Sequence, residues 1–238
     1  MTEAKITQGT LLGGRVAYQQ YQHGHRSGFE PVLMAAMVPA RAHEIILEAG
    51  TGAGAALLCL QARVPGAYAI GIERDPAMAR LATRNLAHAQ IVNGDATRLP
   101  FPAQTFHHVM ANPPWFGTHN TPSPDSTRAL AHHAPTATLA LWIAELIRVV
   151  RDRGSLTLAL PASAYAHAAS CLRPACGGVT LFPLWPRQGE KAKIILLHAR
   201  KASQSPDSVC AGLVLHNETG LTKEAEAVLR EGHALPLK

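Results

Sequence analysis

The sequence predicts an α/β fold, in which parallel strands alternate with helices in one domain or in one domain with an added subdomain. Three observations support this prediction. Four apolar segments of strand length are separated by longer segments with helical periodicity. A glycine-rich turn follows the first of these strands. The 238 residues suffice for a full hydrophobic core, and no apolar run approaches the length of a membrane span.

The N-terminal residues 1–40 are expected to form a hairpin and a helix that pack on the core. Two short strands flank a Gly-Gly turn, and Pro31 suits the first turn of the apolar helix predicted at 32–38. The first ten residues are polar and mixed, unlike a secretory signal. Residues 41–238 then form the main part of a single domain.

The first core strand is predicted at 44–48 and leads into a turn that contains Gly50, Gly52 and Gly54. An Ala/Leu-rich helix follows. Glycines let a ligand approach the backbone closely, and the helix N-terminus supplies N–H donors. This arrangement is typical of a nucleotide site, although a tight turn without a ligand has the same pattern.

The next two strands are followed by acids. The strand predicted at 69–73 ends in Glu73, whose carboxylate could accept hydrogen bonds from both hydroxyls of a ribose. A surface carboxylate paired with a neighbouring arginine is the alternative. The strand at 91–92 precedes Asp95, which could accept from the amino group of an adenine or cap the following turn.

The fourth strand, at 107–111, ends in Asn112-Pro113-Pro114-Trp115. Proline has no N–H and a fixed φ, so this segment should be a stiff, extended loop. The Asn112 side-chain oxygen and the Pro113 carbonyl can accept hydrogen bonds from a planar NH2 group, on which Trp115 can stack. A capping Asn beside a core Trp is the alternative. Because the carboxyl ends of parallel strands share one edge, the four strand ends predict one site.

The second half of the chain is predicted to complete the sheet. Its expected elements are a helix at 139–150, a turn at 151–154, a strand at 155–160, a helix at 161–171, strands at 179–184 and 192–199, and a final helix at 222–230. The last two strands are joined by a short turn and should therefore be antiparallel. This turn carries Arg187, Lys191 and Lys193, which could contact phosphates or simply be solvated.

Charge and composition narrow the class of protein. A net charge of +6 and a pI of about 9.4 fit a polyanionic partner. The four cysteines have neither zinc nor redox spacing, which is typical of free thiols in a reducing cytoplasm. None of the thirteen histidines lies in a helical ligand motif, so no metal is expected. The long connection at 116–135 leaves the predicted site and is interpreted as a substrate lid or a disordered segment.

These motifs resemble those of class I S-adenosylmethionine-dependent methyltransferases. Residues 48–54 match the family's first motif, Glu73 its ribose-binding acid, and 93–96 its adenine-contacting motif. Residues 112–115 match the (Asp/Asn)-Pro-Pro-(Tyr/Phe/Trp) motif of members that methylate planar NH2 nitrogens. The resemblance implies a Rossmann-like, seven-stranded, mostly parallel sheet with an antiparallel last strand and helices on both faces over residues 41–238. It also implies S-adenosyl-L-methionine as the cofactor.

Within this family the sequence is similar to bacterial tRNA adenine-N6 methyltransferases, which modify the purine beside the anticodon of a valine tRNA, position 37. The likeness includes residues 12–15, 24–28, 128–132 and the turn at 187–193. The residues it assigns to catalysis are Asn112, Pro113, Pro114 and Trp115. Those it assigns to the cofactor are Arg26, Glu48, Gly50, Thr51, Gly52, Gly54, Glu73, Arg74, Asp95 and Ala96. Those it assigns to the RNA are Phe116, Arg128, His132, Arg187, Lys191 and Lys193.

The resemblance therefore predicts a cytoplasmic monomer or weak homodimer that methylates the 6-amino group of an adenine in tRNA. A protein-glutamine methyltransferase would use the same Asn-Pro-Pro motif, because a carboxamide is also planar, but such enzymes usually carry a separate N-terminal helical domain. A rRNA guanine methyltransferase would also explain the charge. A non-catalytic RNA-binding module on this scaffold is a further alternative. A nicotinamide dehydrogenase fits the glycine turn but leaves Asn-Pro-Pro-Trp unexplained.

Overall fold

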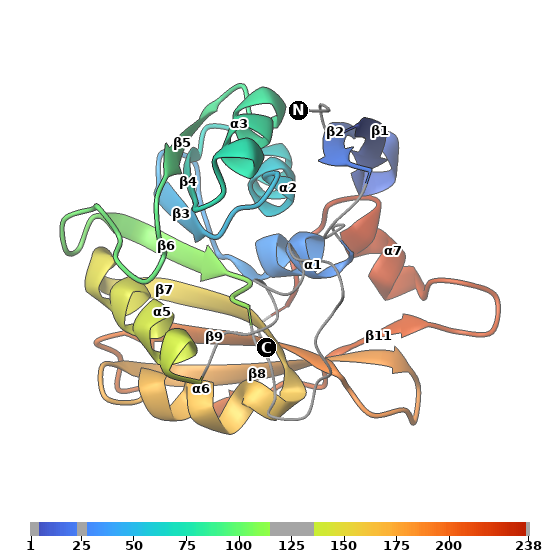
Figure 1. Ribbon diagram of the computed structural model, residues 1–238. Coiled ribbons are helices and arrows are strands. Elements are labelled where there is room, and N and C mark those ends of the chain that lie inside the picture. Colours follow the sequence, from blue (N-terminus) through green and yellow to red (C-terminus); the bar gives the residue numbers. More distant parts are fainter. Residues whose placement is uncertain (1–4, 23–27, 115–135, 237–238) are drawn as a thin grey trace.

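A mixed nine-stranded sheet forms the centre of the protein (Figure 1). The computed structural model describes residues 5–22, 28–114 and 136–236. The strands of the sheet are β3 (Ile45–Ala49), β4 (Tyr68–Glu73), β5 (Ala89–Asn93), β6 (Phe106–Ala111), β7 (Val150–Pro161), β8 (Cys176–Arg187), β9 (Ile194–Lys201), β10 (Ser208–Val209) and β11 (Leu213–His216). Their order is β10-β8-β9-β7-β6-β3-β4-β5, with β11 also paired to β8.

The seven longer strands confirm the predicted fold class. Strands β7, β6, β3, β4 and β5 are parallel to their neighbours in that order. β9 lies between β7 and β8 and is antiparallel to both. β10 and β11 are short strands parallel to β8 that the sequence did not predict. Parallel strands need long crossovers, and the helices supply them.

Helices cover both faces of the sheet. They are α1 (Glu30–Met37), α2 (Ala55–Arg63), α3 (Pro76–Asn85), α5 (Thr136–Val149), α6 (Tyr165–Leu172) and α7 (Lys223–Leu229). α1, α2 and α7 pack with Met110 in one buried cluster, whereas α5 and α6 pack with Val109 in another. Neighbouring strand residues thus point to opposite faces. No described helix is both long and apolar enough to cross a membrane.

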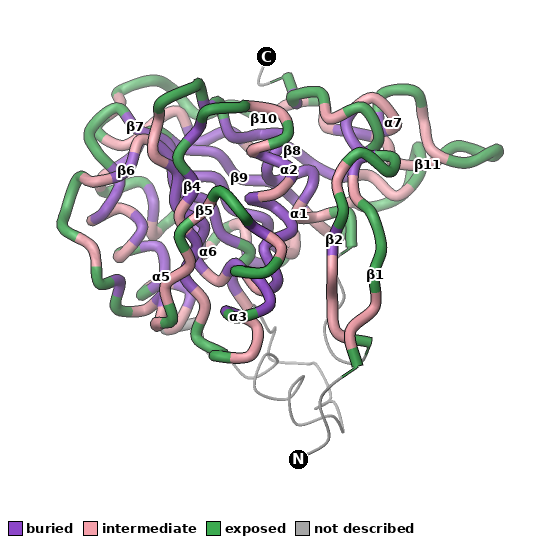
Figure 2. The backbone as a smooth tube through the Cα atoms, turned by 90° about the horizontal axis from the view of Figure 1, so that it is seen from above, coloured by how far each residue is buried: buried purple, intermediate pink, exposed green. Residues whose placement is uncertain are grey.

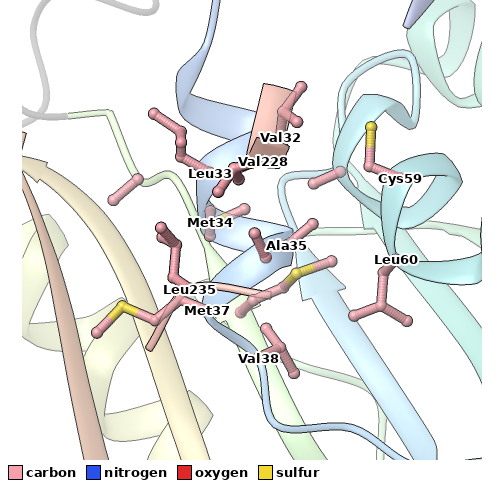
Figure 3. Packing of buried hydrophobic residues seen from close by; sticks show 14 of the residues in the cluster. Val32, Leu33, Met34, Ala35, Met37, Val38, Cys59, Leu60, Val228 and Leu235 are labelled. Atoms are coloured by element: carbon pink, nitrogen blue, oxygen red, sulfur yellow. The ribbon is translucent and has the colours of Figure 1, made fainter. Parts of the chain in front are cut away.

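Helix α1 occupies the middle of the first cluster (Figure 3). Leu33 and Met34 are fully buried there, beside Leu60 of α2 and Val228 of α7. β1 (Ile6–Leu11) and β2 (Val16–Tyr21) form the predicted hairpin, which is a separate two-stranded antiparallel sheet. The strands of the main sheet are mostly buried, whereas the residues of this hairpin are mostly half-buried or exposed (Figure 2).

Two boundaries were predicted wrongly. The predicted turn at 151–154 lies inside β7, where the register shifts between Phe106 and His108 and Arg153 has a φ of 62°. A Cβ on Gly154 would lie 2.6 Å from the His107 carbonyl oxygen, so the bulge requires a glycine there. β8 runs on to Arg187, although a turn was predicted from residue 185.

Candidate active site

The ends of four neighbouring strands form one edge of the sheet, as the sequence predicted. Ala49 at the end of β3 pairs with Ile72 of β4 on one side and with Ala111 of β6 on the other. Glu73 pairs with Asn93 at the end of β5. The glycine turn, the two acids and the Asn-Pro-Pro segment are therefore brought together at this edge.

The glycine turn has a backbone that only glycine adopts easily. Gly50, Gly52 and Gly54 have φ values of 70°, 56° and 88°. The N–H groups of Gly50 and Thr51 both donate to the carbonyl of Ile72, at 2.8 and 3.0 Å. A Cβ on Gly50 would lie 2.7 Å from the ring of Trp142. The turn is thus held close to β4 on one side and to an aromatic ring on the other.

Glu73, the last residue of β4, holds the glycine turn through a hydrogen bond. Its Oε2 accepts a 2.9 Å hydrogen bond from the N–H of Gly52, and its Oε1 accepts one of 2.9 Å from the N–H of Asp75. The described residues show no ion pair between Glu73 and an arginine. Each carboxylate oxygen can accept a second hydrogen bond, so the group can hold the turn and still bind hydroxyls.

Glu48 lies beneath the turn and is only 4% exposed. Its Oε2 accepts a 2.7 Å hydrogen bond from the hydroxyl of Thr51. Burial raises the pKa of Glu48 to about 8, while hydrogen bonds from Thr51 and from the N–H of Leu57 in the first turn of α2 oppose that rise. Glu48 is therefore protonated at neutral pH and supports the turn without presenting a charge.

Asp95 lies just beyond β5 and caps the turn that follows. Its Oδ1 accepts hydrogen bonds of 2.8 Å from both the N–H and the hydroxyl of Thr97. The backbone hydrogen bond from Thr97, its hydroxyl and the nearby Arg74 lower the pKa of Asp95. Ala96 is buried. The capping alternative is therefore observed, and the ionised carboxylate retains acceptor capacity for a ligand.

Asn112 is exposed directly after the fully buried Ala111. Pro113 is buried and Pro114 is half-buried, which anchors the start of the segment. A polar amide is thus presented at the edge by a strand that is buried up to its last residue. Five other predicted site residues lie outside the described residues: Arg26, Trp115, Phe116, Arg128 and His132.

The basic residues of the β8–β9 connection lie on the same edge but farther along it. Arg187 ends β8, while Lys191 and Lys193 are exposed in the turn before β9. In sheet order, β7 and β9 separate β8 from β6. These cations therefore do not adjoin Asn112, and they are placed for contacts away from the reacting group.

One residue that positions the glycine turn was not predicted. The side-chain amide of Asn85 at the end of α3 donates to the carbonyls of Gln19 and Ala53, each at 2.8 Å. Its oxygen accepts from the N–H of Gln19 at 2.9 Å. Asn85 thereby ties hairpin strand β2 to the glycine turn across 66 residues of sequence. No local pattern marks such a contact.

Known proteins are similar to this chain in sequence and in fold. Residues 46–154 match the family model of a methyltransferase domain. The tRNA1(Val) (adenine(37)-N6)-methyltransferase of Bacteroides thetaiotaomicron is 28% identical over 141 residues, which cover 56% of this chain and 59% of that protein. The protein with the same description in Actinobacillus succinogenes is 26% identical over 204 residues, covering 80% of this chain and 82% of the relative.

Solved structures show the same fold. A predicted O-methyltransferase of Agrobacterium tumefaciens superposes with a TM-score of 0.72 at 24% identity and covers 86% of this chain and 96% of its own. Geranyl diphosphate C-methyltransferase of Streptomyces coelicolor, solved with S-adenosyl-L-homocysteine, gives a TM-score of 0.52 at 13% identity and covers 73% of this chain and 75% of its own. The chain therefore has the fold of these methyltransferases, and its residues 46–154 match the methyltransferase-domain family.

Proposed function

We propose that this protein transfers a methyl group to the exocyclic 6-amino group of an adenine in tRNA. The observation that carries the proposal is the exposed Asn112, which follows β6 directly and precedes two anchored prolines at the edge that also bears Glu73 and Asp95. The two relatives described as tRNA adenine-N6 methyltransferases support the choice of substrate. The net charge of +6 suits an RNA partner.

The residues at the edge fit S-adenosylmethionine. Glu73 can accept from ribose hydroxyls, Asp95 can accept from an adenine amino group, and the glycines of the turn allow a ligand to approach its backbone closely. When bound, the cofactor supplies an electrophilic methyl group on its sulfonium. Glu48 and Thr51 hold the turn from below and keep it in one conformation.

Asn112 and Pro113 act on the amine that is methylated. An aromatic amine has its lone pair delocalised into the ring, so it is a weak nucleophile. The side-chain oxygen of Asn112 and the carbonyl of Pro113 can accept its two N–H groups and favour a more tetrahedral nitrogen, which frees the lone pair. Asn112 is no base, and the proton leaves to water after transfer. Most of the rate enhancement then comes from positioning and desolvation.

An adenine within a folded RNA must leave its stack to reach this edge. Single-stranded loops offer unstacked bases at the lowest cost, so a tRNA loop is the expected target. The proposal places the protein in the cytoplasm, where it would act as a monomer or a weak homodimer.

The test is methyl transfer from radiolabelled S-adenosylmethionine to total tRNA, rRNA and protein extract, offered in parallel and followed by nucleoside analysis. The expected product is N6-methyladenosine in tRNA, with Asn112→Ala as the inactive control. Label in rRNA guanine or in protein glutamine would overturn the choice of substrate. Tight cofactor binding without label in any fraction would support a non-catalytic module instead.

A further inference from the structure

A second exposed group of side chains lies on the same edge of the sheet, beyond β8. The rings of Phe29 and His216 have their centroids 6.0 Å apart at an interplanar angle of 41°. Phe29 precedes α1 and is 42% exposed, while His216 ends β11. His216 pairs directly with Arg187 at the end of β8. An aromatic ring and an imidazole therefore lie side by side, and the imidazole belongs to a residue that pairs with an arginine on the neighbouring strand.

The position of this group relative to Asn112 follows from the strand registers. Ala111 pairs with Leu158, Leu158 with Leu197, and Leu197 with Leu181. Arg187 thus lies three strands to the side of Asn112 and several residues farther toward the edge. With about 4.8 Å between strands and about 3.3 Å per residue, the separation is roughly 20 Å. β6, β8 and β11 point the same way in Figure 1, so both groups face the same side.

Strand pairing and one side-chain hydrogen bond hold the backbone of β11 and the end of β8 in place. The indole N–H of Trp185 donates to the carbonyl of Ala211 at 2.9 Å and so fixes the start of β11 on β8. His216 is also bridged to Leu221. Arg187 has a side chain that is 62% exposed, and its ion pair with Glu190 is long, at 3.8 Å. Such a surface pair is weak, so a phosphate can replace the carboxylate.

We propose that Phe29, His216 and Arg187 form a second RNA contact, on which an unpaired base stacks while a neighbouring phosphate binds the guanidinium. This inference rests on the proposed function, because it assigns a further subsite to the same RNA. Base stacking on aromatic side chains tolerates any sequence, and arginine neutralises phosphates. A separation of roughly 20 Å corresponds to about six nucleotides of a stacked strand. The contact is therefore out of reach of a short oligonucleotide centred on the methylated adenine.

The protein contains a matched control pair at the opposite edge of the sheet. Tyr68 begins β4, is 58% exposed, and has its ring centroid 6.4 Å from that of His43 at an angle of 50°. It has the same kind of chemistry as the Phe29–His216 pair, but it lies at the amino ends of the parallel strands. Truncation of Tyr68 therefore reports the cost of losing an exposed aromatic ring without the proposed contact.

The experiment compares Phe29→Ala, Phe29→Trp and Tyr68→Ala with two substrates: full-length tRNA and a five-nucleotide RNA centred on the target adenine. With tRNA as the substrate, Phe29→Ala should raise KM about tenfold and leave kcat unchanged, because stacking of one base supplies an effect of this size. Phe29→Trp should restore the KM of the wild type. Neither variant should change KM for the short RNA. Arg187→Gln should reduce the salt slope of tRNA binding, measured by fluorescence anisotropy, by about one.

The outcomes separate this inference from the proposed function. If tRNA is methylated but Phe29→Ala has the same KM as Tyr68→Ala, the second contact is refuted and the proposed function stands. An equal rise in KM for both RNAs would also refute it, because the effect would then lie at the reacting group. If no RNA is methylated or bound, both proposals fail together.

Discussion

The N–H of Gly52 donates a 2.9 Å hydrogen bond to Oε2 of Glu73, which joins the turn after β3 to the end of β4. The other carboxylate oxygen accepts from the N–H of Asp75 at the start of the next segment. One side chain thus sets the distance between two loops that border the proposed cofactor site. The carboxylate is oriented before any ligand binds, which lowers the entropic cost of binding.

Replacement of Glu73 by alanine should weaken binding of S-adenosylmethionine. The variant loses the proposed ribose acceptor and also the hydrogen bond to the N–H of Gly52. Hydrogen bonds to a charged group contribute about 1.5–3 kcal/mol each, so the dissociation constant should rise at least tenfold. Isothermal titration calorimetry measures the change, and Glu218→Ala, which removes an exposed carboxylate in the turn before α7, is the control. An unchanged dissociation constant in Glu73→Ala would refute the assigned role.

Asn112→Ala should abolish methyl transfer while cofactor binding is retained. The exposed side chain supports no buried packing, so the variant should fold normally. Loss of a group that acts at the reacting nitrogen is expected to lower kcat by about 100-fold or more. Asn112→Asp keeps an oxygen acceptor at the same position and should retain more activity than alanine. Single-turnover transfer and calorimetry together make the test, and activity preserved in Asn112→Ala would contradict it.

Glu48→Gln should alter how stability depends on pH. Because burial raises the pKa of Glu48 to about 8, from an ordinary 4.5, the folded protein holds a proton that the unfolded chain has released. This contribution is fully present below about pH 4.5 and is lost as the pH rises through about 8. Glutamine mimics the protonated acid and removes the slope, which is at most about 1.4 kcal/mol per pH unit.

Urea unfolding of the wild type, Glu48→Gln and the exposed control Glu218→Gln, between pH 5 and pH 9, measures this effect. As the pH rises, the free energy of unfolding of the wild type should fall relative to that of Glu48→Gln. A difference that stays constant over this range would show that Glu48 is ionised in the folded protein.

The strand ends of the site were predictable because each follows from local chemistry. Short apolar runs locate the parallel strands; Gly50 and Asn112 directly follow two of them, and Glu73 is the last residue of a third. The topology of parallel sheets then requires their ends to meet. No knowledge of distant contacts is needed for any of these steps.

The rest of the site depends on contacts between residues distant in sequence. Asn85 reaches Gln19 across 66 residues, and the ring of Trp142 lies against Gly50. The end of β8 was missed for another reason. Pro186 suggests the end of a strand, yet the residues of β8 that pair with β11 are Leu184, Trp185 and Arg187, so the missing N–H of the proline costs no ladder position.

Two buried histidines in the strands of the sheet should make the protein sensitive to acid. His108 lies between the hydroxyl of Ser155, at 2.7 Å, and the carboxylate of Glu44, at 2.9 Å. In the neighbouring strands β9 and β7, Nδ1 of His198 is 3.2 Å from the hydroxyl of Thr157. Burial lowers the pKa of both histidines, and it lowers that of His198 to about 4, with His108 and Arg200 acting in the same direction.

The free energy of unfolding of His198→Gln should therefore fall less than that of the wild type as the pH is lowered. Because the folded pKa of His198 is depressed, its contribution is present above about pH 6.5 and is lost as the pH falls through about 4. Over that window the wild type should lose about 3 kcal/mol more than the variant. Urea unfolding from pH 7.5 to pH 4 measures the two curves, with His88→Gln, an exposed histidine, as the control. Parallel curves for the wild type and His198→Gln would mean that His198 has the same pKa in the folded protein as in the unfolded chain.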